Sequence, residues 1–200
     1  MMKKMKNLVL ILSLILLIGN IACAQDKPVD YGNPTLNTIH SRKSVRNFTG
    51  EAVSKEDLQK IVEAGMCAPT GMNRQPWSFV VVSERDMLDK LLEAMPEKKM
   101  LAKAGAAIIV CAIPEKSSKE MSIIDCSLAG ENMLLAVESL GLGGLWTVAY
   151  PDEKVMNSLR TVLGIPDSVI PVNVMPIGHP EGTDKAKDKY KEENVHWNKW

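Results

Sequence analysis

The stretch MSIIDCSLAGENMLLAVESLGLGGLWTVAY (residues 121–150) decides the fold. Residues 121–140 are mostly apolar and small, which predicts a long helix at the centre of the molecule. Residues 141–150 predict a glycine-rich exit from that helix and then a strand. This order is the reverse of the G-x-G-x-x-G dinucleotide motif, in which the glycines follow a strand and open a helix. The stretch therefore predicts a layered fold and gives no support for a Rossmann site.

Shorter elements flank this helix on both sides. The run SKED (residues 54–57) resembles a capping box with Asp in place of the usual Glu, so it predicts a helix start. That helix has Leu58, Ile61, Val62 and Gly65 on one face and stops before Pro69. The strand at 77–82 is apolar enough to be buried on both faces. The other predicted elements are strands at 106–113 and 169–178 and helices at 84–95 and 152–163. The alternation predicts a mixed α+β or α/β sandwich in one domain.

The composition limits the class of protein. The chain has 200 residues, no net charge and 46% hydrophobic residues. Such a chain can bury a sizeable core and is not disordered. A nucleic-acid-binding protein usually has a basic excess, so nucleic acid is not an expected partner.

Residues 1–25 are predicted to be a bacterial export signal. Lysines 3, 4 and 6 precede an uncharged apolar run from Leu8 to Ile18, which is too short to span a membrane. Ala22-Cys23-Ala24 fits ordinary signal peptidase cleavage, and Cys23 also fits a lipid-anchored first residue. Both alternatives predict an exported protein, either periplasmic or a cell-envelope lipoprotein. Residues 26–35 are predicted to be a linker and residues 36–200 the folded domain.

The cysteines give no sign of a thiol-redox or metal site. Cys67, Cys111 and Cys126 follow the signal and form no C-x-x-C pair. Cys111 lies in an apolar run and Cys126 in a predicted helix, so buried thiols are expected. The histidines lack ligand-like spacing, and no metal is predicted.

The run SRKSVRNF (residues 41–48) places three cations around Ser44. From charge alone, a solvated surface turn is one interpretation. A second group of lysines at 185, 187 and 189 alternates along the tail, so in an extended chain these side chains share one side. If the two groups meet in space, they form a site for a phosphate dianion.

Two further segments have residues that could bind a ligand or partner. The run CAPTGMNRQPWSFVVV (67–82) places amide and hydroxyl groups in a turn before a strand, which fits turn chemistry or a loop that contacts the edge of a planar heterocycle. The polar C-terminal arm (residues 180–200) ends with Val195, Trp197 and Trp200. Aromatic side chains bury a large area when they dock, so this arm is predicted to bind a second subunit.

Together and in this order, these motifs resemble the FMN-dependent nitroreductase family over residues 36–200. The motifs are R-x-S-x-R at 42–46, the A-P-T-G-M-N-R-Q-P-W turn, the small-residue helix ending in GLGGLWTVAY, IGHP at 177–180 and the basic tail. The resemblance implies an obligate homodimer with an α+β sandwich fold and FMN at the dimer interface.

The resemblance also implies roles for individual residues. Arg42, Lys43 and Ser44 match groups on the FMN phosphate and ribityl chain, and Lys187 and Lys189 match the basic pair that closes on the phosphate. Arg46 matches the cation near the pyrimidine edge, where it favours reduced flavin. The turn residues Pro69, Thr70, Gly71 and Asn73 match a loop from the other subunit, and Met72 faces the substrate. The segment Trp146, Thr147, Val148 and Ala149 matches the backbone that lies against the flavin near N5.

By this resemblance the protein is an oxidoreductase. The resemblance implies that it transfers hydride or electrons from NADH or NADPH through FMN to nitroaromatic, quinone or related small-molecule acceptors, with no protein nucleophile. Two alternatives stay open: a reductive dehalogenase or flavin-processing enzyme of the same fold, and a non-catalytic envelope binding protein. The presence of Arg42, Arg46, Lys187 and Lys189 favours an enzyme over the binding protein.

Overall fold

The sheet is built around β2 (Ala106–Ala112), every residue of which is buried. The computed structural model describes residues 30–200, so the predicted export signal and Cys23 lie outside the described residues. Within the unit Gly32–Trp200, β2 pairs antiparallel with β1 (Trp77–Val82) on one side and β5 (Ile170–Gly178) on the other. Strands β3 (Gly143–Gly144) and β4 (Thr147–Val148) both pair antiparallel with β5.

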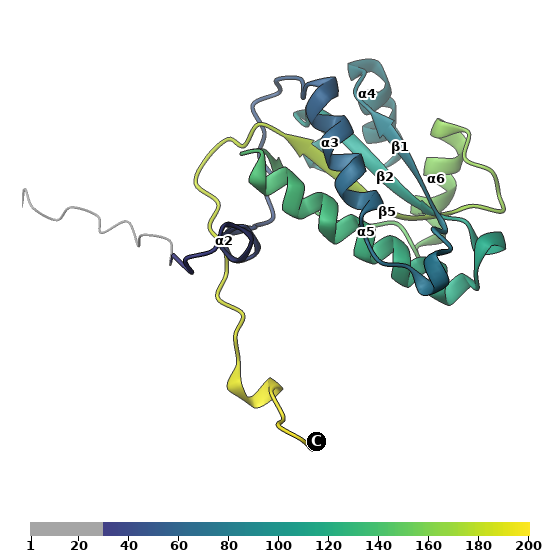
Figure 1. Ribbon diagram of the computed structural model, residues 1–200. Coiled ribbons are helices and arrows are strands. Elements are labelled where there is room, and N and C mark those ends of the chain that lie inside the picture. Colours follow the sequence, from purple (N-terminus) through teal and green to yellow (C-terminus); the bar gives the residue numbers. More distant parts are fainter. Residues whose placement is uncertain (1–29) are drawn as a thin grey trace, which may run out of the picture. The chain divides into compact units, whose positions relative to one another are not determined.

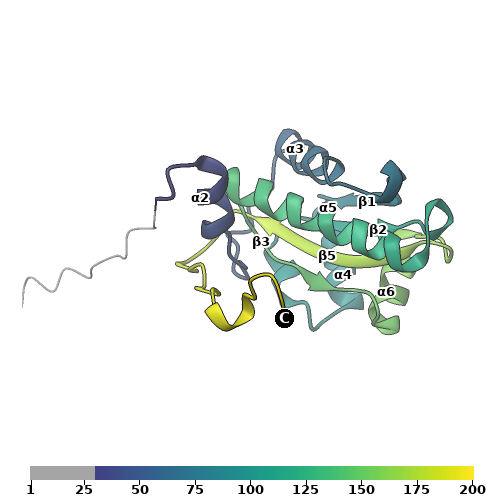
Figure 2. The same ribbon diagram turned by 60° about the horizontal axis from the view of Figure 1, so that its bottom comes forward.

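Helices cover both faces of this sheet (Figures 1 and 2). Alternate residues of a strand point to opposite faces, and β2 shows this directly. Its Ala106, Ile108 and Val110 join the core under α3 and α5. Its Ala107, Ile109 and Cys111 join the core under α4 and α6. The bounds are α3 Lys55–Met66, α4 Arg85–Ala94, α5 Lys119–Ser139 and α6 Glu153–Leu163. The predicted α+β sandwich is confirmed.

The start of α3 is close to the predicted capping box. The Ser54 hydroxyl oxygen accepts from the Asp57 backbone N–H at 3.0 Å, as predicted. The reciprocal contact differs, because the Ser54 hydroxyl donates to the Asp57 carboxylate at 2.8 Å. One residue before the end of α3, Gly65 packs against the Met133 side chain of α5. A side chain at 65 would separate the two helices.

Two strand predictions need correction. The strand at 77–82 was expected to be buried on both faces, but β1 is an edge strand, and Ser78 and Val81 are exposed. The stretch 141–150 was expected to form one strand, but it forms the short strands β3 and β4. The break coincides with Trp146, whose ring occupies the space that a side chain at Gly130 of α5 would need.

Helix α2 (Pro34–Ser41) begins inside the range expected to be linker. Asn33 caps it, because its side-chain oxygen accepts from the backbone N–H groups of Thr35 at 2.9 Å and Leu36 at 3.2 Å. Proline suits the first turn of a helix, where its missing N–H is not needed. Short connections complete the described chain: η1 Gly71–Asn73, η2 Lys99–Ala102, η3 Pro114–Lys116 and η4 Glu192–Asn194.

The cysteine prediction is confirmed for residues 30–200. Cys67, Cys111 and Cys126 are free, and the last two are buried. Burial raises the pKa of each buried thiol to about 12. In the described part of the chain no helix is long and apolar enough to cross a membrane. The same residues have no cluster of His, Cys, Asp and Glu that could hold a metal ion.

Candidate active site

The basic segment (residues 42–46) lies against the end of the sheet. The Val45 N–H donates to the Gly144 carbonyl oxygen at 3.0 Å, and Ser44 forms an isolated bridge with Gly144. The Val45 side chain is buried and fills the space beside Gly143. Since alternate residues of an extended chain face opposite sides, Ser44 and Arg46 are exposed. The anchor at Val45 therefore presents its two polar neighbours outward.

The three cations of this segment differ in what they contact. Arg42 Nε lies 3.4 Å from a carboxylate oxygen of Glu131, and Lys43 Nζ lies 3.1 Å from one of Glu138. Both carboxylates belong to α5. Arg46 has no hydrogen bond or ion pair within residues 30–200. Three cations of this segment were predicted to bind the FMN phosphate or the flavin ring. Of these, Arg46 is thus the one that can bind an anion without first leaving a glutamate.

Strand β4 has one backbone edge directed away from the sheet. Leu145 and Ala149 donate their N–H groups to Pro176 and Val172 of β5, at 3.3 and 3.1 Å. Thr147, between them, pairs with Val174, and its hydroxyl donates to the Val174 carbonyl oxygen at 2.7 Å. Because successive residues of a strand direct their peptide groups to opposite sides, the N–H and C=O of Val148 point away from β5. The predicted backbone donor at Val148 is therefore oriented outward.

The C-terminal arm begins beside the basic segment. Thr49 N–H donates to the His179 carbonyl at 3.0 Å, and Glu181 N–H donates to that of Asn47 at 2.9 Å. Every residue from Pro180 to Trp200 is exposed. Lys187 and Lys189 have no hydrogen bond or ion pair in the described chain. The backbones that lead to the two basic groups are thus hydrogen-bonded to each other at residues 47–49 and 179–181, and Lys187 and Lys189 are exposed beyond this contact.

The polar turn (residues 69–75) lies near the opposite end of α5. Gly71 packs near the Met121 side chain, which is 3.4 Å from where its Cβ would be. At 1.5 Å per residue, Met121 is about 15 Å along α5 from Glu131 and about 25 Å from Glu138. The predicted turn residues Pro69, Thr70, Gly71, Met72 and Asn73 are therefore not brought to the basic segment within one chain.

The backbone of this turn is strained. Met72, Asn73 and Gln75 have φ values of 52°, 53° and 48°, a region that residues other than glycine seldom adopt. Hydrogen bonds hold it: Gln75 N–H donates to the Thr70 hydroxyl oxygen at 3.2 Å, and the Gln75 side-chain amide donates to Asn73 Oδ1 at 2.9 Å. Met72 is 80% exposed. Strain of this kind often marks ligand-binding segments.

Some polar residues near β4 were missed by sequence reasoning. Asn173 of β5 pairs in register with Val148 and is fully buried, and neither side-chain amide atom has a partner in the described chain. An asparagine inside the apolar run VIPVNVMPIG was the signal. Lys98 is also buried, and its Nζ donates to the Val148 carbonyl at 3.2 Å. The run PEKK (residues 96–99) looks like a surface turn and gave no signal.

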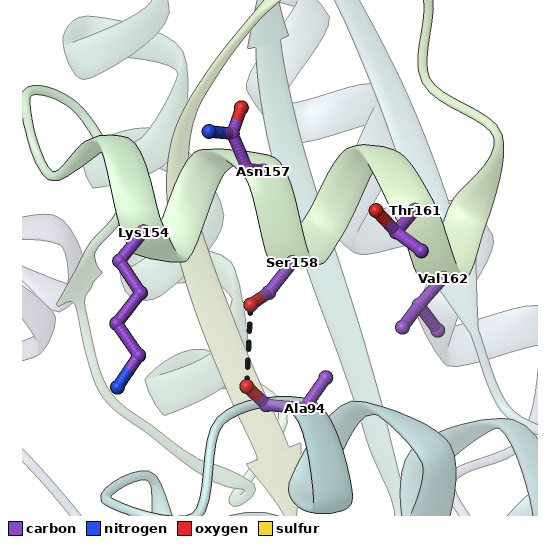
Figure 3. A pocket seen from close by; sticks show the side chains of 6 residues that line it. All are labelled: Ala94, Lys154, Asn157, Ser158, Thr161 and Val162. Atoms are coloured by element: carbon purple, nitrogen blue, oxygen red, sulfur yellow. Dashed lines mark hydrogen bonds between the residues drawn. The ribbon is translucent and has the colours of Figure 1, made fainter.

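A separate groove of about 420 Å³ lies between the end of α4 and α6 (Figure 3). The Ser158 hydroxyl crosses it and donates to the Ala94 carbonyl oxygen at 3.2 Å. The other lining residues are Lys154, Asn157, Thr161 and Val162. No residue of the predicted site lines this groove.

Comparison with known proteins gives the family. Residues 39–179 match the sequence model of the Nitroreductase family, and the chain belongs to that family. An Archaeoglobus fulgidus protein named NADH dehydrogenase/NAD(P)H nitroreductase is 41% identical over 170 residues, which cover 82% of this chain and 98% of that protein.

Solved structures agree in fold. A Bacteroides thetaiotaomicron protein with the same name is 43% identical with a TM-score of 0.80, over 84% of this chain and 99% of that one. A Desulfovibrio desulfuricans nitroreductase, solved in complex with FMN, is 28% identical with a TM-score of 0.72, over 84% and 98% of the two chains.

Proposed function

We propose that this protein is an FMN-dependent NAD(P)H oxidoreductase that reduces nitroaromatic, quinone or related small acceptors. The observation that supports this most is the pair of outward-facing donors, the Val148 backbone N–H and the Arg46 guanidinium. The segments that carry them are joined where Val45 is hydrogen-bonded to Gly144 of β3. Relatives named NAD(P)H nitroreductase and a relative in complex with FMN support the same assignment.

The residues fit FMN in their donor chemistry. FMN has a phosphate dianion and a planar ring with carbonyl and nitrogen acceptors. When bound, it would accept hydride and pass it on. Ser44 and Arg46 offer a hydroxyl and a cation on one exposed edge. Arg42 and Lys43 add positive charge beside them, though each shares its charge with a glutamate of α5. Lys187 and Lys189 would close on the phosphate from the arm.

In this proposal the protein binds and orients the reactants and supplies no nucleophile. The Val148 N–H would hold the ring edge near N5. Arg46 would stabilise the negative charge that two-electron reduction places on the pyrimidine side, which is electrostatic stabilisation by a fixed cation. Met72, exposed on a strained turn, would contact the acceptor.

We also propose that the working unit is a homodimer. The polar turn and the basic segment lie at different ends of α5, so a site that contains both needs a second chain. Three apolar residues that share one face of α5 are each at least 40% exposed: Met121, Ile124 and Leu128. The same holds for Val195, Trp197 and Trp200 of the arm. A second copy would bury both sets.

Mixing two defective variants tests this shared site. Arg46→Met and Asn73→Ala homodimers should each lose most FMN binding. If the two residues come from different chains, a mixed dimer has one intact and one doubly defective site. Random pairing of equal amounts then restores FMN binding to about a quarter of all sites. No recovery, with heterodimers verified by mass spectrometry, would contradict the two-chain site.

The first experiment on function is an absorption spectrum of residues 26–200, before and after anaerobic NADH or NADPH. Flavin bands that bleach with either nucleotide support the proposed reductase. Bands that bleach with dithionite alone point to another electron donor. A protein that takes up no FMN, even after incubation with it, favours the alternative of a non-catalytic binding protein.

We further propose that the protein is exported, because residues 1–25 have the composition of a bacterial signal. Fractionation and labelling with a radioactive fatty acid separate the two forms of processing. Label that is lost in Cys23→Ala supports the envelope lipoprotein. An unlabelled periplasmic protein supports ordinary cleavage, and recovery of the full-length chain in the cytoplasm contradicts export.

A further inference from the structure

Lys98 is the buried charged residue nearest to β4 that the proposed function does not yet use. Its side chain is only 7% exposed. Within the described chain the one hydrogen bond of the Lys98 ammonium goes to the Val148 carbonyl oxygen, 3.2 Å from Nζ. An ammonium group is seldom buried against a neutral carbonyl alone, because that contact replaces little of its hydration.

The surroundings of Lys98 show that its charge has a cost. Burial lowers the pKa of Lys98, and the negative charges of Glu97 and Asp152 oppose this only in part. Methionine has a similar unbranched stem and could fill this space without the penalty. A contribution to stability is therefore a poor explanation for a lysine here.

The position of the Nζ atom gives a better explanation. Within one strand residue, the N–H and the C=O point to the same side. The Val148 carbonyl that Lys98 contacts thus shares an edge with the Val148 N–H, which is directed away from β5. The ammonium fixes the orientation of this peptide and adds a positive charge beside the outward-facing donor.

We propose that Lys98 is a positioning residue for the flavin, which holds the β4 edge in place and makes the bound ring easier to reduce. This inference rests on the proposed function, since it requires FMN at β4. Reduction adds negative charge to the ring. A cation on the same edge of β4 stabilises the reduced ring, and water screens this attraction little because Lys98 is buried. Lys98 would act from the β4 side, whereas Arg46 would act from the pyrimidine side.

The test compares three variants of the full-length dimer loaded with FMN. Lys98→Met removes the charge, Lys98→Arg keeps it, and Lys99→Met is the matched control, because Lys99 is the exposed neighbour. The readouts are the flavin midpoint potential, measured against a reference dye, and the melting temperature without FMN.

Lys98→Met should make reduction about tenfold less favourable, which for a two-electron couple is a shift of about 30 mV to more negative potential. Its melting temperature should be unchanged or higher, because a buried charge is gone. Lys98→Arg should recover most of the potential, and Lys99→Met should resemble the wild type in both readouts.

A Lys98→Met protein that binds FMN with the wild-type potential overturns the inference. If its melting temperature is also lower, Lys98 is a purely structural residue. Failure of the wild-type protein to bind FMN would instead refute the proposed function, so the two failures are distinguishable.

Discussion

Val45 and Gly143 interlock at the point where the basic segment meets the sheet. A Cβ on Gly143 would lie 2.7 Å from Val45 Cγ1 and 2.8 Å from Val45 Cβ, closer than real side chains approach. The absence of a side chain at 143 therefore sets where Ser44 and Arg46 are presented.

Gly143→Ala should displace Val45 and lower the free energy of unfolding by about 1–3 kcal/mol, the usual cost of overpacking. FMN affinity should fall with it. Denaturant unfolding and flavin-fluorescence titration measure the two effects. Val45→Ala removes the two opposing methyl groups and leaves only the Val45 Cβ contact, so the double variant should lose less than the sum of the singles. If the losses in unfolding free energy of the two single variants simply add, the Gly143–Val45 contact does not position the basic segment.

Arg42→Ala should weaken FMN retention by about 1.5–3 kcal/mol, the range for a hydrogen bond to a charged group. Its ion pair with half-exposed Glu131 should contribute less than 1 kcal/mol to stability. Equilibrium dialysis and thermal melts separate the two roles. Glu131→Gln is the matched control and should bind FMN at least as tightly as wild type. Unchanged FMN occupancy in Arg42→Ala would remove this residue from the phosphate site.

Deletion of residues 190–200 should weaken the dimer, because Val195, Trp197 and Trp200 are exposed in the single chain and have large apolar areas to bury. Sedimentation velocity across a dilution series should show dissociation at higher protein concentration than in the wild type. Replacing only Lys191 and Lys199 by Gln keeps the apolar groups and should leave association unchanged. An intact dimer after the deletion would refute the role of the arm.

Ser54→Ala should lower stability by about 1 kcal/mol at neutral pH, since the helix cap is lost. It should also change the acid response. The Ser54 hydrogen bond lowers the pKa of Asp57 below its ordinary value of 3.8. A carboxyl group with a lower pKa in the folded state stabilises the fold above the unfolded value, and this contribution disappears as pH falls through the folded value.

Stability of the wild type should therefore decline more steeply below about pH 4 than that of Ser54→Ala. Urea unfolding between pH 2 and pH 7 measures this slope. Ser83→Ala is the control, because Ser83 is exposed and the helix after it has no side-chain cap. Parallel pH curves for the wild type and Ser54→Ala would contradict the assignment.

The sequence predicted best the elements whose pattern is local. The long run of apolar and small residues at 121–140 and the apolar run at 106–113 correctly predicted α5 and β2. Burial of 77–82 was misjudged because the edge position of β1 depends on sheet order, which one strand does not encode. The division of 141–150 depends on Trp146 packing at Gly130, a contact across the fold.

The residue types of the candidate site could be predicted from the sequence. The partners with which those residues form ion pairs could not. The motif around Ser44 pointed to an anion site. The partners of Arg42 and Lys43 could not be found, because Glu131 and Glu138 are about 90 positions away in the chain and ordinary in a helix. Lys98 was missed for a similar reason: burial of a lysine in a charged turn is decided by what folds over it.

The rate at which the two buried thiols are alkylated measures how often the core of the described chain becomes exposed. With pKa values of about 12, Cys111 and Cys126 are almost entirely protonated at neutral pH, and neither is accessible. Cys67 is exposed. An alkylating reagent should thus modify one cysteine of residues 30–200 quickly, and the other two only as fast as the two sides of the sheet become exposed. The slow phase then measures how often the core opens under native conditions.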